Sequence, residues 1–312
     1  MHRRARSRFA PDREVVPVFY GIGGETFLIR HRIAPLARTL LLASVAVLML
    51  LPVLSTVVNS FMTATEIGGN YASLGKTNTS EFVNLKWIPD WVSFKQYVQV
   101  LIASPQFLHM FWNSVFLVVP IIIGQLLVSC LAAFAFAKLR FPGRGTLFFM
   151  YLITMLMPFQ VTLVPNYLMA DRLGLLNSHS SIVLPGIFAT FGVFLLRQFM
   201  SQIPAAYMEA ATIDGAGYIR LFVSIALPMV KPGLAALVVL LFADYWNMVE
   251  QPLIFLQDAE LQPMSVFLSQ VQKEAFGVTF AASVLYMLPM VLLFLSAERH
   301  FIEGIQLSGV KG

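Results

Sequence analysis

The chain has 312 residues, of which 58% are hydrophobic and 12% charged, and its mean hydropathy is +0.75. Soluble domains carry about 25% charged residues, so this composition excludes an ordinary soluble domain and indicates a membrane-embedded chain. The formal net charge is +5. The placement of the basic residues indicates membrane orientation rather than a nucleic-acid partner.

Residues 1–33 form an arginine-rich leader before the apolar part of the chain. We interpret it as a topology anchor near anionic lipid headgroups, although an RNA- or lipid-binding tail has the same composition. The first long apolar run starts after Arg38 and continues to residue 58. It is longer than the core of a signal peptide, which has about 7–15 residues, so we expect a retained membrane helix.

Six apolar segments have about the 20 residues that a bilayer-spanning helix needs, or more. They cover residues 39–58, 111–137, 146–169, 182–200, 233–256 and 278–297. Several contain proline, which membrane helices tolerate, often with a kink. The sequence therefore predicts an all-α, polytopic membrane protein with six spans within residues 34–298, followed by a tail of residues 299–312.

The lysines and arginines predict how these spans are oriented. If the N-terminus lies inside the cell, 16 of the 21 basic residues fall on the inner side. The outer five are Lys76, Lys86, Lys95, Arg172 and Lys273. Cytoplasmic segments carry such an excess of positive charge, so both termini and the polar segment 201–232 are expected in the cytoplasm.

Residues 69–77 read GNYASLGKT, which is similar to a phosphate-binding loop. That pattern needs four residues between the first glycine and Gly-Lys-Thr, whereas this segment has five and is expected outside the cell. The histidines and Cys130 show no metal-ligand spacing, and no nucleophile stands beside a base. We expect neither a nucleotide site, nor a metal site, nor catalytic residues.

The most specific pattern is EAATIDGAGYIRLFVSIALP, which begins at Glu209 and ends at Pro228. A helix-forming Glu-Ala-Ala, a glycine and a Leu-Pro pair predict a short helix, a turn and a second short helix that stops at the proline. Either Gly215 or Gly217 can supply the left-handed turn residue. An ordinary amphipathic helix at the membrane surface is the alternative interpretation.

The spacing of EAA, three residues, Gly, nine residues and Ile-x-Leu-Pro resembles the EAA loop of ABC importer permeases. The likeness covers about residues 34–312. The terminal Gly-Val-Lys-Gly is similar to the maltose-type subunit of the carbohydrate-uptake branch. The resemblance implies a heterodimer of two permeases in a bacterial inner membrane, two ABC ATPase subunits and an extracytoplasmic solute-binding protein. ATP and magnesium would bind the ATPases, and this chain would hold no cofactor.

The resemblance also implies roles for individual residues. The ATPase would contact or be coupled through Glu209, Ala210, Ala211, Asp214, Gly215, Ile225, Leu227 and Pro228. The tail residues Val310, Lys311 and Gly312 would reach toward the ATPase pair. On the outer side, the loop of residues 257–277 would contact the solute-binding protein.

The predicted fifth span carries the most deeply placed ionisable residues, Asp244 and Glu250. A charge at a helix centre costs about 2.5–3.5 kcal/mol by insertion scales, which makes such residues functional candidates. In a continuous helix, Asp244, Asn247 and Gln251 share one stripe, and Trp246 and Glu250 share another. These five residues predict a path for hydroxyl-rich solutes. Alternatively, Asp244 bonds a neighbouring helix and Glu250 lies at the outer interface.

We therefore expect a permease subunit of an ATP-driven importer for a sugar or oligosaccharide, working by alternating access. The family often has an acid directly after Trp-Asn, where this chain has Met248, so the identity of the solute does not follow from the resemblance. A permease for a non-sugar solute, a secondary transporter and a membrane-bound enzyme are the alternatives. The secondary transporter would need ion-coupling residues within the spans, for which Asp244 is thin support.

Overall fold

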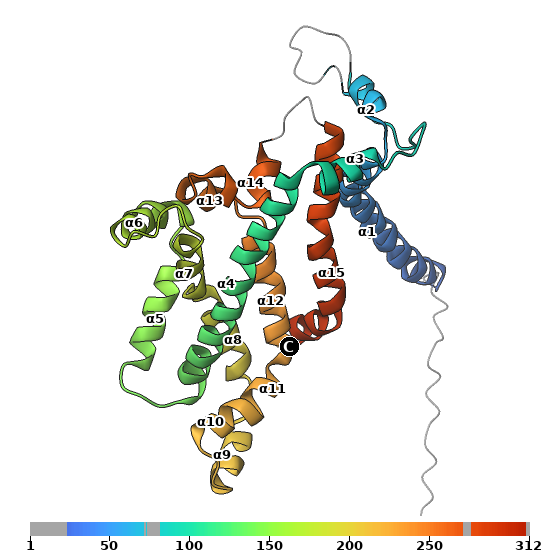
Figure 1. The fold of residues 1–312 in the computed structure, drawn as a ribbon. Helices are drawn as coiled ribbons and strands as arrows, with labels where there is room; N and C mark the ends of the chain where they lie inside the picture. Colours follow the sequence, from blue (N-terminus) through green and yellow to red (C-terminus); the bar gives the residue numbers. More distant parts are fainter. Residues whose placement is uncertain (1–23, 72, 74–81, 271–275, 310–312) are drawn as a thin grey trace, which may run out of the picture. The chain divides into compact units, whose positions relative to one another are not determined.

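The computed structural model describes residues 24–71, 73, 82–270 and 276–309, with side chains detailed between residues 38 and 298. Every regular element in these ranges is helical (Figure 1). The chain divides into two compact units, residues 1–54 and 55–312. The long helices are α1 (Gly24–Ser60), α4 (Pro105–Lys138), α5 (Arg144–Met155), α6 (Phe159–Arg172), α8 (Thr190–Ser201), α12 (Lys231–Trp246) and α15 (Phe276–Gly309). Shorter helices are α2 (Ala64–Asn70), α3 (Lys95–Val98), α7 (Ser180–Ile187), α9 (Ala205–Ile213), α10 (Tyr218–Leu221), α11 (Leu227–Met229), α13 (Glu250–Phe255) and α14 (Met264–Ser269). Two π-helical turns (Gln99–Ala103, Phe222–Ala226) and a 3₁₀ turn (Ala259–Leu261) complete the set.

The described part of the first unit is the N-terminal stretch of α1. Its apolar side chains are exposed within the chain, including Leu41, Leu48 and Met49. A helix that is apolar all round suits burial in a membrane. The leader predicted for residues 1–33 lies largely outside the described residues, which begin at residue 24.

The second unit is a helical bundle built around α4. This helix packs against α7, α8 and α12, and α15 packs against α12. Buried side chains of α4, α8 and α12, among them Leu196 and Leu237, form the main core. A Cβ atom on Gly192 of α8 would collide with Ser129 Oγ of α4, so glycine there permits the close helix approach that small residues give in membranes.

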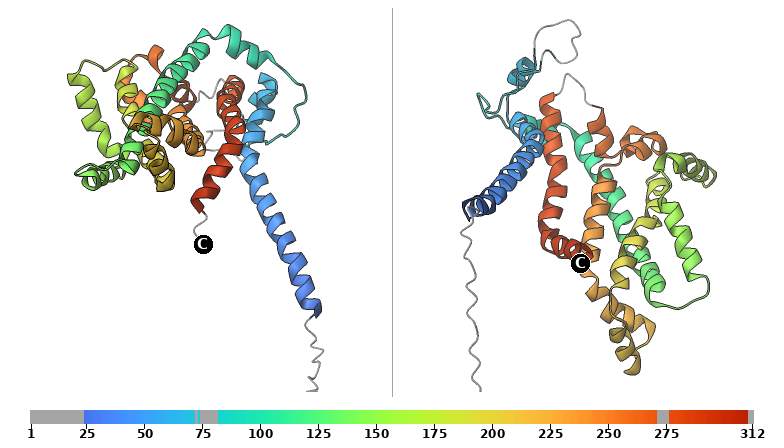
Figure 2. Two further views of the ribbon diagram at one scale, coloured as in Figure 1. Left: turned by 90° about the horizontal axis from the view of Figure 1, so that it is seen from below. Right: turned by 180° about the vertical axis from the view of Figure 1, so that it is seen from behind.

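Within this unit, two pairs of short helices lie at opposite ends of the bundle. Helices α13 and α14 lie at one end, and α9 and α10 lie at the other (Figures 1 and 2). The segment 201–232 and the loop after α13 are therefore separated by the length of α12. This separation agrees with their predicted positions on opposite sides of a membrane.

Four helical segments are long and apolar enough to cross a membrane: Arg38–Ser60, Pro105–Lys138, Ser180–Ser201 and Phe276–Glu298. Two bent pairs raise the number to as many as six in the described residues. They are Arg144–Met155 with Phe159–Arg172, bent by 100°, and Tyr218–Met229 with Lys231–Trp246, bent by 73°. The all-helical, polytopic fold is as predicted, but the expected spans 146–169, 182–200 and 233–256 are not continuous helices. The second of these is divided between α7 and α8, which are separated by two residues.

Proline accounts for the interruptions of the spans 146–169 and 233–256. Pro158 lies in extended backbone just before α6, and a residue that precedes proline is itself disfavoured in the helical conformation. In the fifth span, α12 ends at Trp246 and α13 begins at Glu250. Pro252 has no N–H to bond the carbonyl of Met248, so the chain restarts a helix with Pro252 in its first turn.

Candidate functional site

The end of α9 is a complete helix-termination motif. Gly215 adopts φ +79°, its N–H donates to the Thr212 carbonyl at 3.0 Å, and the Ala216 N–H donates to the Ala211 carbonyl at 2.9 Å. These two bonds define a Schellman motif with glycine in the left-handed position. Gly217 has φ −73° and precedes α10. Of the two candidate glycines, Gly215 therefore makes the turn.

The second helix of the segment differs from the prediction at its end. Leu227 and Pro228 do not stop it, because the helical path continues through the π-helical turn into α11 and bends only at Val230, before α12. The Leu227 N–H donates to the carbonyl of Phe222, five residues back. Pro228 lies in the first turn of α11, where its missing N–H is tolerated.

The segment has one packed face and one exposed face. Ala211, Ile225 and Leu227 pack against the bundle core. Exposed positions include Glu209, Ala210, Asp214, Gly215 and Pro228, and no residue of α9 is buried. Six large apolar side chains of this segment that the motif does not include are also exposed: Tyr207, Ile213, Tyr218, Ile219, Val223 and Met229. Their position off the stripe of packed residues is the sequence signal that could have identified them.

A cationic side chain attaches the segment 201–232 to the bundle by a hydrogen bond. Lys138, the last residue of α4, donates from Nζ to the carbonyl of Ile203 at 2.6 Å. Ile203 is buried and stands just before Pro204, which caps α9. The start of α9 is thereby attached to the end of the central helix.

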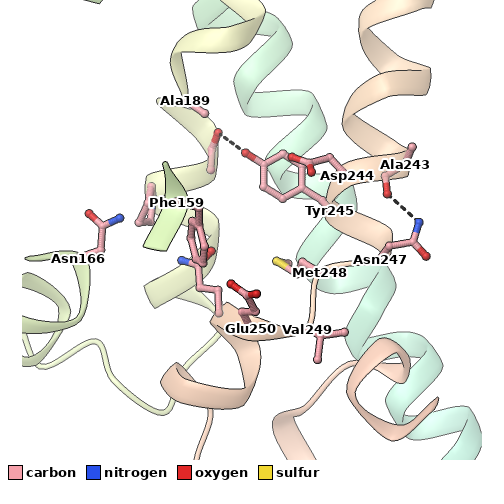
Figure 3. Close-up of a pocket in the computed structure, with 13 residues that line it drawn as sticks. Phe159, Asn166, Ala189, Ala243, Asp244, Tyr245, Asn247, Met248, Val249 and Glu250 are labelled. Carbon is pink, nitrogen blue, oxygen red and sulfur yellow. Dashed lines mark hydrogen bonds between the residues drawn. The ribbon is translucent and has the colours of Figure 1, made fainter. Parts of the chain in front are cut away.

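A cavity of about 630 Å³ lies where α6, α7, α12 and α13 meet (Figure 3). The break between α12 and α13 forms one wall, with Asn247, Met248 and Val249. The remaining lining residues are Phe159, Asn166, Pro185, Gly186, Ala189, Ala243, Asp244, Tyr245, Glu250 and Gln251. The cavity thus combines apolar walls with hydroxyl, amide and carboxylate groups, as small-molecule sites commonly do.

The polar groups of the cavity are partly held by neighbours. Asn247 Nδ2 donates to the Ala243 carbonyl at 2.8 Å, and the Tyr245 hydroxyl lies 3.4 Å from the Gly186 carbonyl (Figure 3). Gln160 Nε2 donates to Glu250 Oε2 at 3.4 Å, which connects α6 to α13. The Asp244 carboxylate is exposed and forms no hydrogen bond with the described residues.

Four of the five residues predicted for the solute path line this cavity: Asp244, Asn247, Glu250 and Gln251. Trp246 does not, because it is 2% exposed and packs in the core against Phe242 and Tyr286. The two predicted stripes of polar residues require one continuous helix through the fifth span. The break after Trp246 changes the direction of every later side chain. Phe159 and Asn166 were missed, since no local pattern connects α6 with the fifth span.

Some predictions fall outside the described residues. These are Val310, Lys311 and Gly312 of the tail, and most of the segment 69–77. Within the described residues, no group of three or more His, Cys, Asp or Glu side chains could hold a metal ion.

The chain is similar to known transport proteins. Residues 110–303 match the family model described as "Binding-protein-dependent transport system inner membrane component". An arabinooligosaccharides transport system permease protein of Halalkalibacterium halodurans is 29% identical over 273 residues, which is 86% of this chain and 94% of that protein. An sn-glycerol-3-phosphate transport system permease protein of Pectobacterium atrosepticum is 35% identical over 201 residues, 63% of this chain and 72% of that protein.

Solved structures give the same architecture. The crystal structure of a bacterial ABC transporter involved in the import of the acidic polysaccharide alginate has a chain that matches with a TM-score of 0.71. The identity is 23%, covering 92% of this chain and all of that chain. A second structure, in complex with an alginate pentasaccharide-bound periplasmic protein, gives a TM-score of 0.60 at 15% identity and covers 88% and 95%. These likenesses show the fold, and the family match extends over more than half of the sequence. The chain belongs to the family of inner membrane components of binding-protein-dependent transport systems.

Proposed function

We propose that this chain is a permease subunit of an ATP-driven importer for a sugar or oligosaccharide, with residues 34–298 as the permease domain. The names of its relatives support a carbohydrate or a related solute. They include arabinooligosaccharides, a phosphate ester and, for the structural neighbour, an acidic polysaccharide. Because these names cover both neutral and anionic solutes, they do not indicate the charge of the solute that this chain transports.

The observation that carries the proposal is the form of the segment 201–232. Helix α9 has no buried residue, yet it is attached at its start through Lys138 and ended by the Schellman motif at Gly215. A short helix that is exposed, attached at its start and packed on the core through Ala211 and Ala216 can transmit a movement of a soluble partner to the bundle. We infer that Glu209, Ala210 and Asp214 face the partner, with Tyr207 and Ile213 supplying apolar contact area.

The partners follow from this assignment. We infer a second permease subunit, two ABC ATPase subunits that bind ATP and magnesium, and an extracytoplasmic solute-binding protein. This chain would hold no cofactor itself. Both termini would lie in the cytoplasm, with residues 1–33 near the lipid headgroups and Val310, Lys311 and Gly312 near the ATPases. Closure of the ATPases would move α9 and turn the bundle between inward- and outward-facing states.

We infer that the solute passes through the cavity beside the broken fifth span in this half of the transporter. It offers Asp244, Asn247, Glu250 and Gln251 as polar groups from both sides of the break. Such discontinuous helices line the solute sites of other membrane transporters, because their free backbone groups can serve a polar ligand.

Purification and reconstitution test the proposal. The tagged chain, extracted from its own host in mild detergent, should retain an ATPase and a second permease. In liposomes with ATP and the host's periplasmic extract, the complex should take up labelled neutral oligosaccharide. Uptake driven by an ion gradient without ATP would instead support a secondary transporter. A chain that retains no ATPase would contradict the assignment of α9.

A further inference from the structure

The cavity beside the break carries charge of one sign. Asp244 and Glu250 are its only ionisable carboxylates, and no lysine, arginine or histidine is among the 13 lining residues. Asp244 comes from α12 and Glu250 from α13, so the two carboxylates lie on either side of the break (Figure 3). An anion that enters would therefore meet negative charge from both helices.

No cation neutralises these carboxylates within the described part of the chain. The ion pairs found there join Lys86 to Glu66 and Asp90, in the segment between α1 and α4. Glu250 accepts one hydrogen bond, from the neutral amide of Gln160. Clefts with low-dielectric walls and one sign of charge concentrate the field and attract ions of the opposite sign.

Gln251 provides a second and independent indication of a ligand. Its side chain lines the cavity and the residue is 9% exposed, yet its amide forms no hydrogen bond with the described residues. The amide atoms are not among the fully buried unpaired atoms of the described residues, so they remain accessible from the cavity, and an amide offers both donors and acceptors. Hydroxyl groups, which also donate and accept, are suited to pair with it.

We propose that this cavity admits neutral or cationic, hydroxyl-rich solutes and rejects sugar acids and sugar phosphates. Asp244 and Glu250 set the selectivity for charge, and Gln251 pairs with solute hydroxyl groups. A like charge opposite an unpaired carboxylate is strongly disfavoured, whereas a neutral hydroxyl can donate to it. The inference rests on the proposed role of the cavity in solute passage, but its electrostatic part can be measured without any transport assay.

The experiment uses a reporter thiol in the cavity. Val249→Cys is introduced into the full chain together with Cys130→Ala, which removes the only native cysteine. The purified complex is treated with methanethiosulfonate reagents carrying a trimethylammonium, a hydroxyethyl or a sulfonatoethyl group. Each reagent forms a mixed disulfide with the thiol and releases methanesulfinate. The rate of modification by the cationic reagent is divided by the rate of modification by the anionic reagent. This ratio is then divided by the same ratio measured for free 2-mercaptoethanol, which gives the corrected ratio.

We expect the corrected ratio to be about tenfold or more at low salt, because steering by a charged cleft changes association rates by 10–10³. Glu250→Gln and Asp244→Asn should each lower it several-fold, and high salt should lower it as well. Asp171→Asn, which removes an exposed carboxylate of α6 outside the cavity lining, is the matched control and should leave it unchanged.

A corrected ratio near one, or a ratio that neither carboxylate variant changes, would overturn the proposal. So would a thiol that none of the three reagents modifies, since the cavity would then be closed to water. These results do not depend on ATP or on the binding protein. A chain that fails to couple ATP hydrolysis to uptake would contradict the proposed function and leave the charge measurement intact.

Discussion

Trp246 and Tyr286 exchange hydrogen bonds across the interface of α12 and α15. The indole N–H of Trp246 donates to the Tyr286 carbonyl at 3.1 Å, and the Tyr286 hydroxyl donates to the Trp246 carbonyl. Their rings are stacked, with centroids 5.5 Å apart and planes inclined by 22°. The last carbonyls of a helix lack partners within it, so this exchange fixes the end of α12 directly before the break that lines the cavity.

Tyr286→Phe should destabilise the protein without removing the stacked ring. The Trp246 carbonyl would lose its donor, which costs about 1–3 kcal/mol for a buried group. The expected result is a lower free energy of unfolding of the purified protein in mild detergent. Tyr207→Phe, at an exposed tyrosine of α9, is the control and should have no effect. Equal stability of Tyr286→Phe and the wild-type protein would show that the exchange does not hold the helix end.

Gly215→Val should release the ATPase or uncouple its hydrolysis from uptake, with normal membrane insertion. A left-handed conformation costs a non-glycine residue about 1–2 kcal/mol, and more for a β-branched one. No atom lies within 4 Å of a Cβ at Gly215 or Gly217, so serine at the two positions gives a matched pair. Gly215→Ser should weaken coupling, whereas Gly217→Ser places a favourable cap before α10. ATPase retention and transport unchanged in Gly215→Val would refute the docking role.

Lys138→Met should loosen the attachment of α9 to α4. A hydrogen bond from a charged donor is worth about 1.5–3 kcal/mol, and the Ile203 carbonyl would lose this one. We expect faster proteolysis within residues 201–217 of the purified protein. Arg140→Met removes an exposed positive charge two residues away and serves as the control. If both variants are cleaved at the wild-type rate, the lysine is not the attachment.

Lys86 predicts a pH dependence for the segment between α1 and α4. Hydrogen bonds to Asp90 and then to Glu66 raise the pKa of Lys86 above its usual range. A raised pKa of a basic group stabilises the fold below the ordinary value of about 10.4, and this contribution disappears as the pH rises through the raised pKa. The melting temperature of Lys86→Met should therefore be lower than that of the wild-type protein at pH 8, and the difference should vanish in strong alkali. Lys95→Met, at an exposed lysine, should show no difference at either pH.

The loop after α13 should contact the solute-binding protein through its exposed part. Gln257 and Gln270 are exposed, whereas Ser265 is buried and donates to the Met248 carbonyl at 2.6 Å. Gln257→Cys and Gln270→Cys, each in a Cys130→Ala background and labelled with a thiol-specific photoactivatable reagent, should form crosslinks to the binding protein in the ATP-trapped complex. Ser265→Cys should not. Crosslinks only from cysteines in the outer segment of residues 59–106 would place the contact there instead.

The sequence was sufficient where the structural signal is local. Residues 111–137 were expected to form a span, and α4 covers Pro105–Lys138. The EAA spacing located the short helix and limited its turn to two glycines. Hydropathy did not reveal the breaks at Pro158 and after Trp246, because a proline in a membrane helix produces anything from a kink to a full interruption. The outcome depends on tertiary partners such as Tyr286, which stands 40 residues from Trp246.

The cavity was the least predictable feature for the same reason. Its two carboxylates could be named as candidates because ionisable residues are rare in apolar segments. Their neighbours Phe159 and Asn166 come from α6, and only the folded bundle brings them to the fifth span. The direction of each side chain beyond Trp246 also depends on the break. Trp246 itself lies before the break, and its packing against Tyr286 of α15 keeps it out of the cavity lining.

The break at Asn247–Val249 also restricts where lipid can lie around the assembled transporter. Acyl chains offer no hydrogen bonds, so a stretch of non-helical backbone at membrane depth must be covered by protein or by water. Lipid is thereby kept from the side of the bundle on which the break opens. It is left with apolar surfaces of regular helix, such as the exposed Leu292 and Leu295 on α15.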